Sequence, residues 1–574
     1  MVNITINNTP VQVPENTTIL EAAKLNNINI PHLCYLKGLN EIGACRVCVV
    51  EVEGVDRLVS SCNTVATEGM KIHTNSPKVR QARKVNVELL LSQHSARCPE
   101  CSRSGNCELQ RVANALGVLK LPYEEDIKDF KWNNEFPLIR NDQKCIKCMR
   151  CVQVCDKIQQ MNVWDVAKTG THTVVACRGG KDITELNCTV CGQCITHCPV
   201  AALTERDDTQ KVLAAMADKD KITIASVAPA TRTSWGEQLG LTHEEATAER
   251  LVSALRAVGF DYVFDTDFSA DLTIMEEASE FLVRLQNGEL KEYPMFTSCC
   301  PGWVRFIKME FPDLVPQLSS AKSPQQMFGA IIKSWYAQIL GVEPEKIYHV
   351  SFMPCTAKKY ECDVSCMDSS GARDVDVVLT VRELARLIKS EGINVKALPE
   401  SAFDAPLGTA SGAGHIFGTT GGVMEAALRT AYNLATGKNP EPDAFKDVRG
   451  YDGWKEAKFE IAGTELKIAV ANGLGNIRKL CEAIRNKKVH YDFVECMACP
   501  TGCAGGGGQP IHEGEELGEG RGKILLNLDQ KSNLRFSHEN PSIVQCYKEY
   551  LGKPLGEKSH HLLHTDQSKW ELWK

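Results

Sequence analysis

Two runs of cysteines have the spacing of iron–sulfur cluster ligands. Each run follows the pattern Cys-x2-Cys-x2-Cys-x3-Cys, and the second ends in Cys198-Pro199 whereas Asp156 follows the first. This spacing is typical of bacterial [4Fe–4S] ferredoxins, in which the fourth cysteine of each run binds the other cluster. The pattern therefore predicts two cubanes that exchange their last ligands. The two expected ligand sets are Cys145, Cys148, Cys151 and Cys198, and Cys188, Cys191, Cys194 and Cys155.

Two further groups of metal-ligating residues precede these runs. The first is Cys34, Cys45, Cys48 and Cys62, and the second is His94, Cys98, Cys101 and Cys107. Thiolates from one loop and one remote residue suit a [2Fe–2S] cluster, with structural zinc as the alternative for the first group. Zinc and a [4Fe–4S] cluster accept the Cys3His set equally well, so the residues of the second group leave both open. Its place immediately after the first group favours a cluster.

Clusters that follow one another along a chain relay single electrons between the surface and a deeper site. They do not name a reaction, because an electron-transfer subunit without chemistry of its own would look the same up to about residue 208. Three more cysteine-bearing loops lie beyond that point, at residues 297–303, 353–359 and 495–503. Four of their thiolates, Cys300, Cys355, Cys499 and Cys503, could form a buried cubane, which the loops alone do not establish.

The elements that must position these loops differ between the two halves of the chain. Short alternating runs at 5–7 and 11–13, followed by a helix beginning near residue 19, predict a small mixed module at the start. Strand-like runs at 222–225, 262–264, 375–379 and 468–470 alternate with helices and predict a layered α/β second half. A helix expected over 273–287 places Glu277, Glu280 and Arg284 on one face, which without further information indicates a solvated helix face.

Composition limits the classes of function. The chain has 574 residues, enough for several domains, and a net charge of -7, so it offers no basic surface of the kind that nucleic-acid binders use. The sequence contains no run of about 18 apolar residues, so it predicts no membrane span. Twenty-six cysteines with no secretory or twin-arginine signal indicate a cytoplasmic protein whose thiols hold metal.

The three loops of the second half resemble, in order and nearly completely, the signature motifs of the [FeFe] (iron-only) hydrogenase family. The resemblance extends over essentially the whole chain, and the first two ligand groups are also similar to those of the large NADH-dehydrogenase subunit. It implies a multidomain α/β protein with four modules. These are a β-grasp [2Fe–2S] ferredoxin-like module at 1–79, a His/Cys3 [4Fe–4S] module at 80–125, a 2[4Fe–4S] ferredoxin-like module at 126–208 and a large α/β H-cluster domain at 209–574.

The resemblance also implies the cofactor and the reaction. Cys300, Cys355, Cys499 and Cys503 would bind the [4Fe–4S] part of an H-cluster, with Cys503 bridging to a diiron unit that carries CO, cyanide and an azadithiolate. The reaction would be the reversible conversion of two protons and two electrons into H2. One [2Fe–2S] and three [4Fe–4S] accessory clusters would carry the electrons, and radical-type maturation proteins would assemble the diiron unit.

Further roles follow from the same resemblance. Protons would pass from solvent through Arg284, Glu280, Ser319 and Glu277 to Cys299, whose alternative interpretation is an inert buried thiol. Lys358 would face a cyanide ligand, where its alternative is a surface lysine. The remaining residues expected around the cofactor are Pro229, Ala230, Ser323, Pro324, Gln325, Met353, Phe417 and Met497.

Two positions depart from the family pattern. Ala230 stands where a serine often reaches a cyanide, and Cys496 stands where an apolar residue is common. Losing a hydrogen bond to the cluster is expected to shift its potential and so to affect the preferred direction of the reaction. Cysteines 177, 362, 366, 481, 496 and 546 remain, and we expect ordinary free thiols, with a redox pair at Cys362 and Cys366 as the alternative.

The sequence also indicates an electron carrier and separates the hydrogenase interpretation from other functions. The glycines at 412–422 do not fit GxGxxG because Phe417 takes the third place, so a ferredoxin or flavodoxin is expected as the electron carrier. An electron-entry subunit should lack the 297–303 loop, and a hydrogen sensor or an iron–sulfur scaffold would be expected to replace Cys299. The tail after about residue 520, with His560-His561, is expected to wrap the large domain without chemistry of its own.

Overall fold

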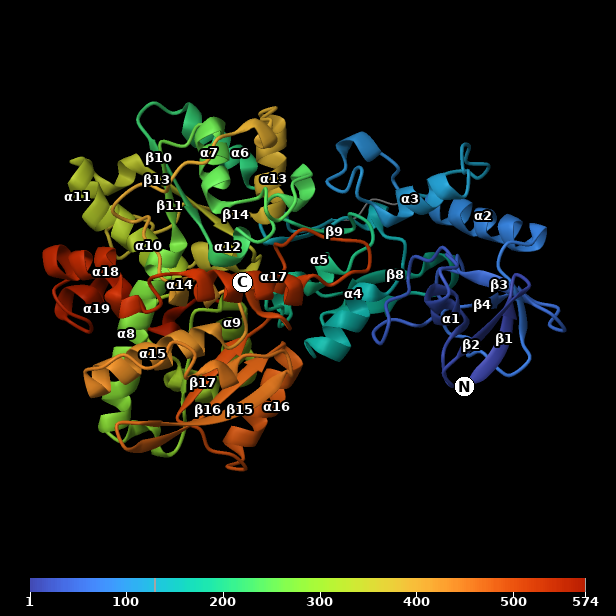
Figure 1. Cartoon of the computed structure of the whole chain (residues 1–574). Coiled ribbons are helices and arrows are strands. Elements are labelled where there is room, and N and C mark those ends of the chain that lie inside the picture. The colour runs from blue at the N-terminus through green and yellow to red at the C-terminus, as the bar shows by residue number, and fades with distance from the viewer. Residues whose placement is uncertain (128–130, 573–574) are drawn as a thin grey trace.

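The computed structural model describes residues 1–127 and 131–572. Residues 128–130 of the expected module at 126–208, and residues 573–574 of the expected domain at 209–574, therefore lie outside the described part. A small β-rich unit stands at the N-terminal end, a cysteine-rich middle region follows, and the large C-terminal half occupies the other end of the molecule (Figure 1). No helix in the described ranges is long and apolar enough to cross a membrane.

The N-terminal unit is a five-stranded sheet of order β2-β1-β5-β3-β4, covered by helix α1. Its elements are β1 (Val2–Ile6), β2 (Thr9–Val13), α1 (Ile19–Leu25), β3 (Val49–Val52), β4 (Val59–Ser60) and β5 (Lys71–His73). The Thr18 side chain caps α1 by accepting from Glu21 N, in agreement with the expected start of this helix. Ile4, Ile6 and Leu20 lie in the core between sheet and helix.

The middle region is built from short elements between cysteine loops. They are α2 (Pro77–Leu91), α3 (Glu108–Ala115), β6 (Leu138–Arg140), α4 (Arg150–Gln153), β7 (Trp164–Ala167), β8 (Val174–Cys177), α5 (Gln193–Thr196) and β9 (Leu203–Glu205). Strands β6 and β9 pair antiparallel, as do β7 and β8. Helices α4 and α5 each follow a residue in the left-handed region, Met149 and Gly192, so the two cysteine runs fold alike.

Two four-stranded sheets organise the C-terminal half. The first, of order β11-β10-β13-β14, is entirely parallel, and the second has the order β12-β17-β16-β15 with only β15 antiparallel. The strands are β10 (Ile222–Val227), β11 (Tyr262–Asp265), β12 (Met295–Phe296), β13 (Ile347–Met353), β14 (Val377–Thr380), β15 (Trp454–Ile461), β16 (Thr464–Asn472) and β17 (Phe493–Met497). All four runs that the sequence predicts as strands lie in these sheets, the third beginning two residues later than expected.

Helices cover both sheets. They are α6 (Thr209–Ala217), α7 (Ala248–Val258), α8 (Thr266–Gln286), α9 (Pro301–Glu310), α10 (Pro324–Ile331), α11 (Ala337–Leu340), α12 (Ala357–Cys362), α13 (Val381–Ser390), α14 (Gly412–Ile416), α15 (Gly422–Thr436), α16 (Leu474–Arg485), α17 (Gly518–Lys531), α18 (Pro541–Cys546) and α19 (Glu557–Leu563). Helices α7 and α13 pack on one face of the first sheet, and α8 and α10 pack on the other together with α18 and α19.

Helix α8 is the element that joins the two sheets (Figure 1). Phe268 and Leu272 pack against the first sheet, whereas Ile274 and Phe281 pack against the second. The helix is longer than the expected 273–287 segment and begins seven residues earlier, because Asp265 at the end of β11 caps it directly. Its charged face, expected to be a solvated stripe in the absence of the family resemblance, is buried at Glu277 and Glu280.

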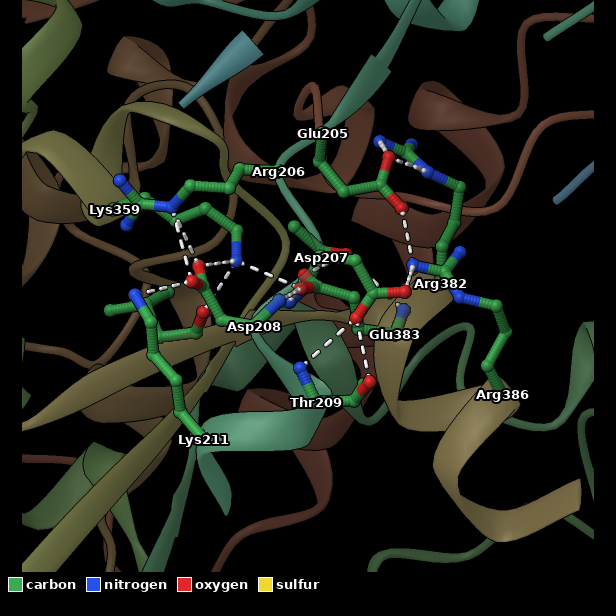
Figure 2. Close-up of polar contacts among 12 residues, drawn as sticks. Glu205, Arg206, Asp207, Asp208, Thr209, Lys211, Lys359, Arg382, Glu383 and Arg386 are labelled. Carbon is green, nitrogen blue, oxygen red and sulfur yellow. Dashed lines mark hydrogen bonds and ion pairs between the residues drawn. The ribbon is translucent and has the colours of Figure 1, made fainter. Parts of the chain in front are cut away.

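Buried ion pairs fasten the middle region to the C-terminal half (Figure 2). Glu205, at the end of β9, accepts from Arg382 at 2.6 Å and from Arg386 at 3.0 Å. Asp208 pairs with Lys359 at 2.7 Å, and Lys359 pairs in turn with Glu383 at 2.9 Å. Burial alone would raise the pKa of Glu205, but the two guanidinium groups hold that pKa well below its usual range.

This junction yields a stability prediction. The Arg382→Ala substitution leaves Glu205 buried without its main partner, so the free energy of unfolding should fall by about 3–5 kcal/mol at pH 7. The matched Arg386→Ala substitution removes a partner that is partly exposed, so it should cost less than about 1 kcal/mol. Urea unfolding followed by circular dichroism measures both, and equal losses would contradict the assignment of Arg382 as the main partner.

Candidate active site

A cavity of about 80 Å³ lies where the strands of both sheets end. Strand β10 runs into Pro229 and Ala230, β12 into Cys299, β13 into Cys355, and β17 into Cys503, because parallel strands bring their carboxyl ends to one edge. Helix α8 supplies a further wall through Thr266 and Ala270. Of the residues expected around the cofactor, those that line the cavity are Pro229, Ala230, Cys299, Cys300, Pro324, Gln325, Met353, Cys355, Lys358, Phe417, Met497 and Cys503.

Four cysteines come together at this cavity. Cys300 precedes α9, Cys355 follows β13, and Cys499 and Cys503 follow β17, where Cys499 lies beside the other three. Burial and, to a smaller extent, the neighbouring Cys300 raise the pKa of the Cys355 thiol to about 12. Buried thiolates therefore need a cation, and a metal centre supplies one. The set fits a cubane, since all four thiols are free and their loops converge.

Hydrogen bonds to Glu361 hold the polar groups of the cavity wall in place. Lys358 Nζ donates to Glu361 Oε2 at 2.9 Å and to the carbonyl oxygen of Cys299 at 3.1 Å. Ser323, a residue expected near the cofactor, donates to the same Glu361 oxygen at 2.9 Å. Gln325 also donates to Glu361, while its buried Oε1 has no partner among the described residues. An unpaired amide oxygen at the cavity is consistent with a group bound there.

One face of α8 leads from this cavity toward the surface. Glu277 is fully buried, and burial together with nearby Glu280 raises its pKa to about 8. Ser319 Oγ donates to Glu280 Oε2 at 2.7 Å, and Arg284 Nη2 donates to Glu280 Oε1 at 2.6 Å. Cys299 also interacts with Glu277, and burial, then this carboxyl group, raises its pKa. Neither carboxyl oxygen of Glu277 has a hydrogen-bond partner among the described residues, so hydrogen bonds join Arg284, Glu280 and Ser319, while the steps to Glu277 and Cys299 stay a prediction.

The accessory cysteines gather in the expected sets. Cys198 lies with Cys145, Cys148 and Cys151, whereas Cys155 lies with Cys188, Cys191 and Cys194, so the fourth ligands are exchanged. Cys34, Cys45, Cys48 and Cys62 form a third group. His94 Nδ1 lies 3.0 Å from the Lys144 carbonyl oxygen and must donate to it, which leaves Nε2 free as a ligand. Cys107 lies beside Cys101, close to the helical turn that begins at Cys98.

One accessory set touches the cavity cysteines. Cys499 lies beside Cys191, and a Cβ added at Gly507 would come within 2.3 Å of the Cys191 carbonyl oxygen. Thr356, next to Cys355, donates to the Val190 carbonyl oxygen at 2.7 Å. Glycine at 507 is therefore required for the close packing of these two loops.

Some features were missed by sequence reasoning or depart from it. Glu361 stands three residues after Lys358, and that helical spacing was the available signal. Glu495 is buried and accepts from Gly421 N at 2.7 Å and Met424 N at 2.8 Å, which orients the glycine-rich loop beside the cavity. Cys496 points into the core beside Cys481 and Cys300.

The leftover thiols have separate surroundings. Cys362 Sγ donates to the Val375 carbonyl oxygen at 3.2 Å, whereas Cys366 Sγ lies 3.8 Å from Thr565 Oγ1. All 26 cysteines are free of disulfides. This arrangement agrees with ordinary thiols.

Known families match four segments of the chain. Residues 221–507 match the C-terminal domain of the iron-only hydrogenase large subunit, and residues 516–568 match the iron hydrogenase small subunit. Residues 1–77 match a 2Fe-2S iron-sulfur cluster binding domain, and residues 83–121 match the iron-sulfur binding region of NADH-ubiquinone oxidoreductase G. The chain thus carries both iron–sulfur domains and a hydrogenase domain.

Relatives support the same family over the full length. The chain is 48% identical to the NADP-reducing hydrogenase subunit HndD of Solidesulfovibrio fructosivorans, covering 99% of each chain. It is 40% identical to iron hydrogenase 1 of Clostridium pasteurianum, covering 99% of this chain and all of that one. The solved [FeFe]-hydrogenase HydA1 of Chlamydomonas reinhardtii is 44% identical over 62% of this chain and 98% of its own, with a TM-score of 0.56.

A more distant relative is the cytosolic iron-sulfur assembly component 3 of Rattus norvegicus, which is 31% identical over 66% of this chain and 82% of its own. The full-length matches are closer and are hydrogenases. The chain therefore belongs to the [FeFe] hydrogenase family, and it is an oxidoreductase that interconverts protons, electrons and H2.

Proposed function

We propose that the cavity holds an H-cluster and that the chain catalyses the reversible reaction of two protons and two electrons to H2. This proposal rests on three structural features that lie together at one cavity. They are four cysteines, a fifth thiol at Cys299 that the cubane does not need, and an adjoining accessory set at Cys191. A scaffold or a sensor would have little use for Cys299 at the end of a buried carboxyl path.

Cys300, Cys355, Cys499 and Cys503 are the proposed cubane ligands, with Cys503 shared with the diiron unit. That unit, when bound, supplies the open metal site at which H2 is made or split. Lys358 presents a cation to its anionic ligands, and Glu361 keeps the lysine charged and oriented. Met353, Phe417 and Met497 exclude water from the cavity. Pro229, Ala230 and Pro324 complete the wall, while Ser323 supports it through Glu361.

The chain's own residues move the proton. With a pKa of about 8, Glu277 is neutral at pH 7, and its O–H proton can pass to the Cys299 sulfur as the thiol gives up its own S–H proton toward the cavity. Ser319 passes a proton between Glu280 and Glu277, because its hydroxyl can accept from one carboxyl group while donating to the other. Arg284 holds Glu280 at the partly exposed end of this path.

We propose one [2Fe–2S] and three [4Fe–4S] accessory clusters on the four ligand sets described above. The corresponding modules are a β-grasp ferredoxin-like module at 1–79, a His/Cys3 module at 80–125, a bacterial 2[4Fe–4S] ferredoxin-like module at 126–208 and the H-cluster domain at 209–574. The exchange of Cys155 and Cys198 between neighbouring sets supports the third module. Domain matches at 1–77 and 83–121 support the first two.

Ferredoxin or flavodoxin is the proposed electron carrier. A second candidate is a pyridine nucleotide reached through another subunit, since the relative HndD is named as an NADP-reducing hydrogenase subunit. Glycines 412–422 of this chain do not have the spacing of a dinucleotide-binding loop, so a nucleotide would have to bind elsewhere.

The reaction itself is tested with a viologen dye on anaerobic protein that carries a matured diiron unit. Evolution and uptake should both occur, and Cys299→Ala should lower both by about 10²–10⁴-fold, because proton transfer to the cofactor is broken. Cys481→Ala, which removes another buried thiol, is the matched control and should retain the rate. Full activity of Cys299→Ala at unchanged iron content would refute the relay, and a silent parent would favour the sensor or scaffold.

Glu277 gives a prediction about pH. Its proton-donating form is lost as the pH rises through about 8, so hydrogen evolution should decline there. Glu277→Gln should be slow, by about 10²-fold, at every pH.

Because the native pKa is raised from 4.5, the native state binds the extra proton, and the unfolding free energy of the parent should fall relative to the variant between pH 4.5 and 8. Urea unfolding across this range measures the difference, with Glu289→Gln as an exposed control.

The electron carrier is tested with the chain alone. Reduced ferredoxin or flavodoxin should drive hydrogen evolution at a rate comparable to that with the dye, whereas NADPH alone should not. If both protein carriers fail while the dye succeeds, the carrier assignment is wrong and a nucleotide-binding partner protein becomes the better explanation.

A further inference from the structure

The C-terminal segment lies directly against the serine loop of the proposed relay. Thr565 N donates to the Ser320 carbonyl oxygen at 2.8 Å, and Ala321 and His564 form an antiparallel bridge. The segment belongs to residues 516–568, which match the iron hydrogenase small subunit. The sequence predicts that this tail wraps the large domain without chemistry of its own, but His564 brings a titratable ring to the serine loop.

His564 connects two buried glutamates of α8. Its Nδ1 lies 2.8 Å from Ser320 Oγ, and that hydroxyl lies 3.1 Å from Glu280 Oε1. On the other side of the ring, Nε2 lies 3.0 Å from Glu276 Oε2. The three side chains are 6%, 7% and 0% exposed for His564, Glu280 and Glu276, so water does not compete for these contacts. Glu280 is thus a branch point, since Arg284 reaches the same Oε1 oxygen.

The partners of Glu276 fix the direction of these hydrogen bonds. Its Oε1 accepts from the Tyr547 hydroxyl at 2.5 Å, and its Oε2 accepts from Leu555 N at 2.8 Å. A carboxylate that serves as an acceptor on both oxygens also accepts from His564 Nε2–H. The neutral imidazole then keeps its Nδ1 lone pair toward Ser320, where it can take up a proton with Glu276 as the counter-ion.

We propose that His564 is a proton-storing side arm of the relay, a role that rests on the proposed function of Glu280. In the storing step Glu280 Oε1–H breaks as Ser320 Oγ takes that proton. The original Ser320 O–H bond breaks as His564 Nδ1–H forms, so an imidazolium and a carboxylate result. The reverse step returns the proton to Glu280. Each H2 needs two protons, and a stored proton supplies the second without a new exchange with solvent.

The surroundings favour this role over two others. The order Glu276, His564, Ser320 is that of a nucleophilic serine site, but Ser320 Oγ lies 3.1 Å from a Glu280 oxygen and its backbone N–H donates to Glu280 at 3.1 Å. The hydroxyl therefore faces a second buried carboxyl group where a nucleophilic serine would face its substrate. The charged or titratable groups that face the ring are Glu276 and Glu280 from α8, His560 from α19 and the Tyr547 phenol. His560 stacks on His564 at 4.8 Å without a hydrogen bond, so it is not a member of the chain of transfers.

The test compares His564→Gln and Ser320→Ala with the parent in the matured enzyme. Glutamine can keep both hydrogen bonds but cannot hold the extra proton. Hydrogen evolution with reduced viologen is measured from pH 5 to 8, the range in which histidine side chains change charge. We expect each variant to lose the inflection of the parent in this range and to be slower by about 3- to 10-fold at the acid end, and the double variant to be no slower. His561→Gln, an exposed neighbour on α19, should behave as the parent.

A second readout does not depend on turnover. In infrared difference spectra against pH, the carboxyl band of Glu280, identified with Glu280→Gln, should appear at a different pH in His564→Gln than in the parent. An unchanged band and an unchanged pH profile, while Ser319→Ala still abolishes turnover, would overturn the side arm and leave the relay standing. Full turnover of Ser319→Ala would instead overturn the relay, and the side arm with it.

Discussion

Burial of thiols and charged groups in one apolar cavity is the constraint on which the rest of this structure depends. A thiolate or an ammonium group removed from water must find an opposite charge or a metal, and the cavity meets that demand with Glu361 behind Lys358 and with a metal-ligating set at its mouth. The same exclusion of water raises the pKa of Glu277 to about 8, which suits a proton donor at neutral pH. In the proposed function, protons and electrons reach the cavity by separate paths, the protons along α8 and the electrons past Cys191.

The arrangement of secondary structure explains how the two paths meet. Two sheets direct the carboxyl ends of β10, β12, β13 and β17 at one point, and α8 passes between the sheets. The proposed proton path uses the buried face of α8, and the proposed electron path enters where Gly507 lets the Cys191 loop approach. Ion pairs of Glu205 and Asp208 hold the middle region against α12 and α13 (Figure 2).

Local spacing made much of this predictable. The crossed sets of Cys155 and Cys198 follow from ligand spacing because the geometry of a cluster constrains neighbouring residues directly. Burial of Glu277 could not be read in this way, since a charged helix face is usually solvated and only long-range packing between two sheets covers it. The contact of His564 with Ser320 joins positions 244 residues apart, and no local pattern records it. Glu495 was hidden for a similar reason, because its partners Gly421 and Met424 lie at the start of α15, 74 and 71 positions away along the chain.

The cavity is proposed to hold the centre that reacts with H2, with protons delivered by the Glu277 and Cys299 path. This proposal is tested most directly by supplying D2 to the matured protein in ordinary water, without any electron carrier, and following HD by mass spectrometry. The account predicts steady HD formation, because the Glu277 and Cys299 path delivers protons while no net electrons leave. An absence of HD from protein with a full complement of iron and an intact cofactor spectrum would contradict it.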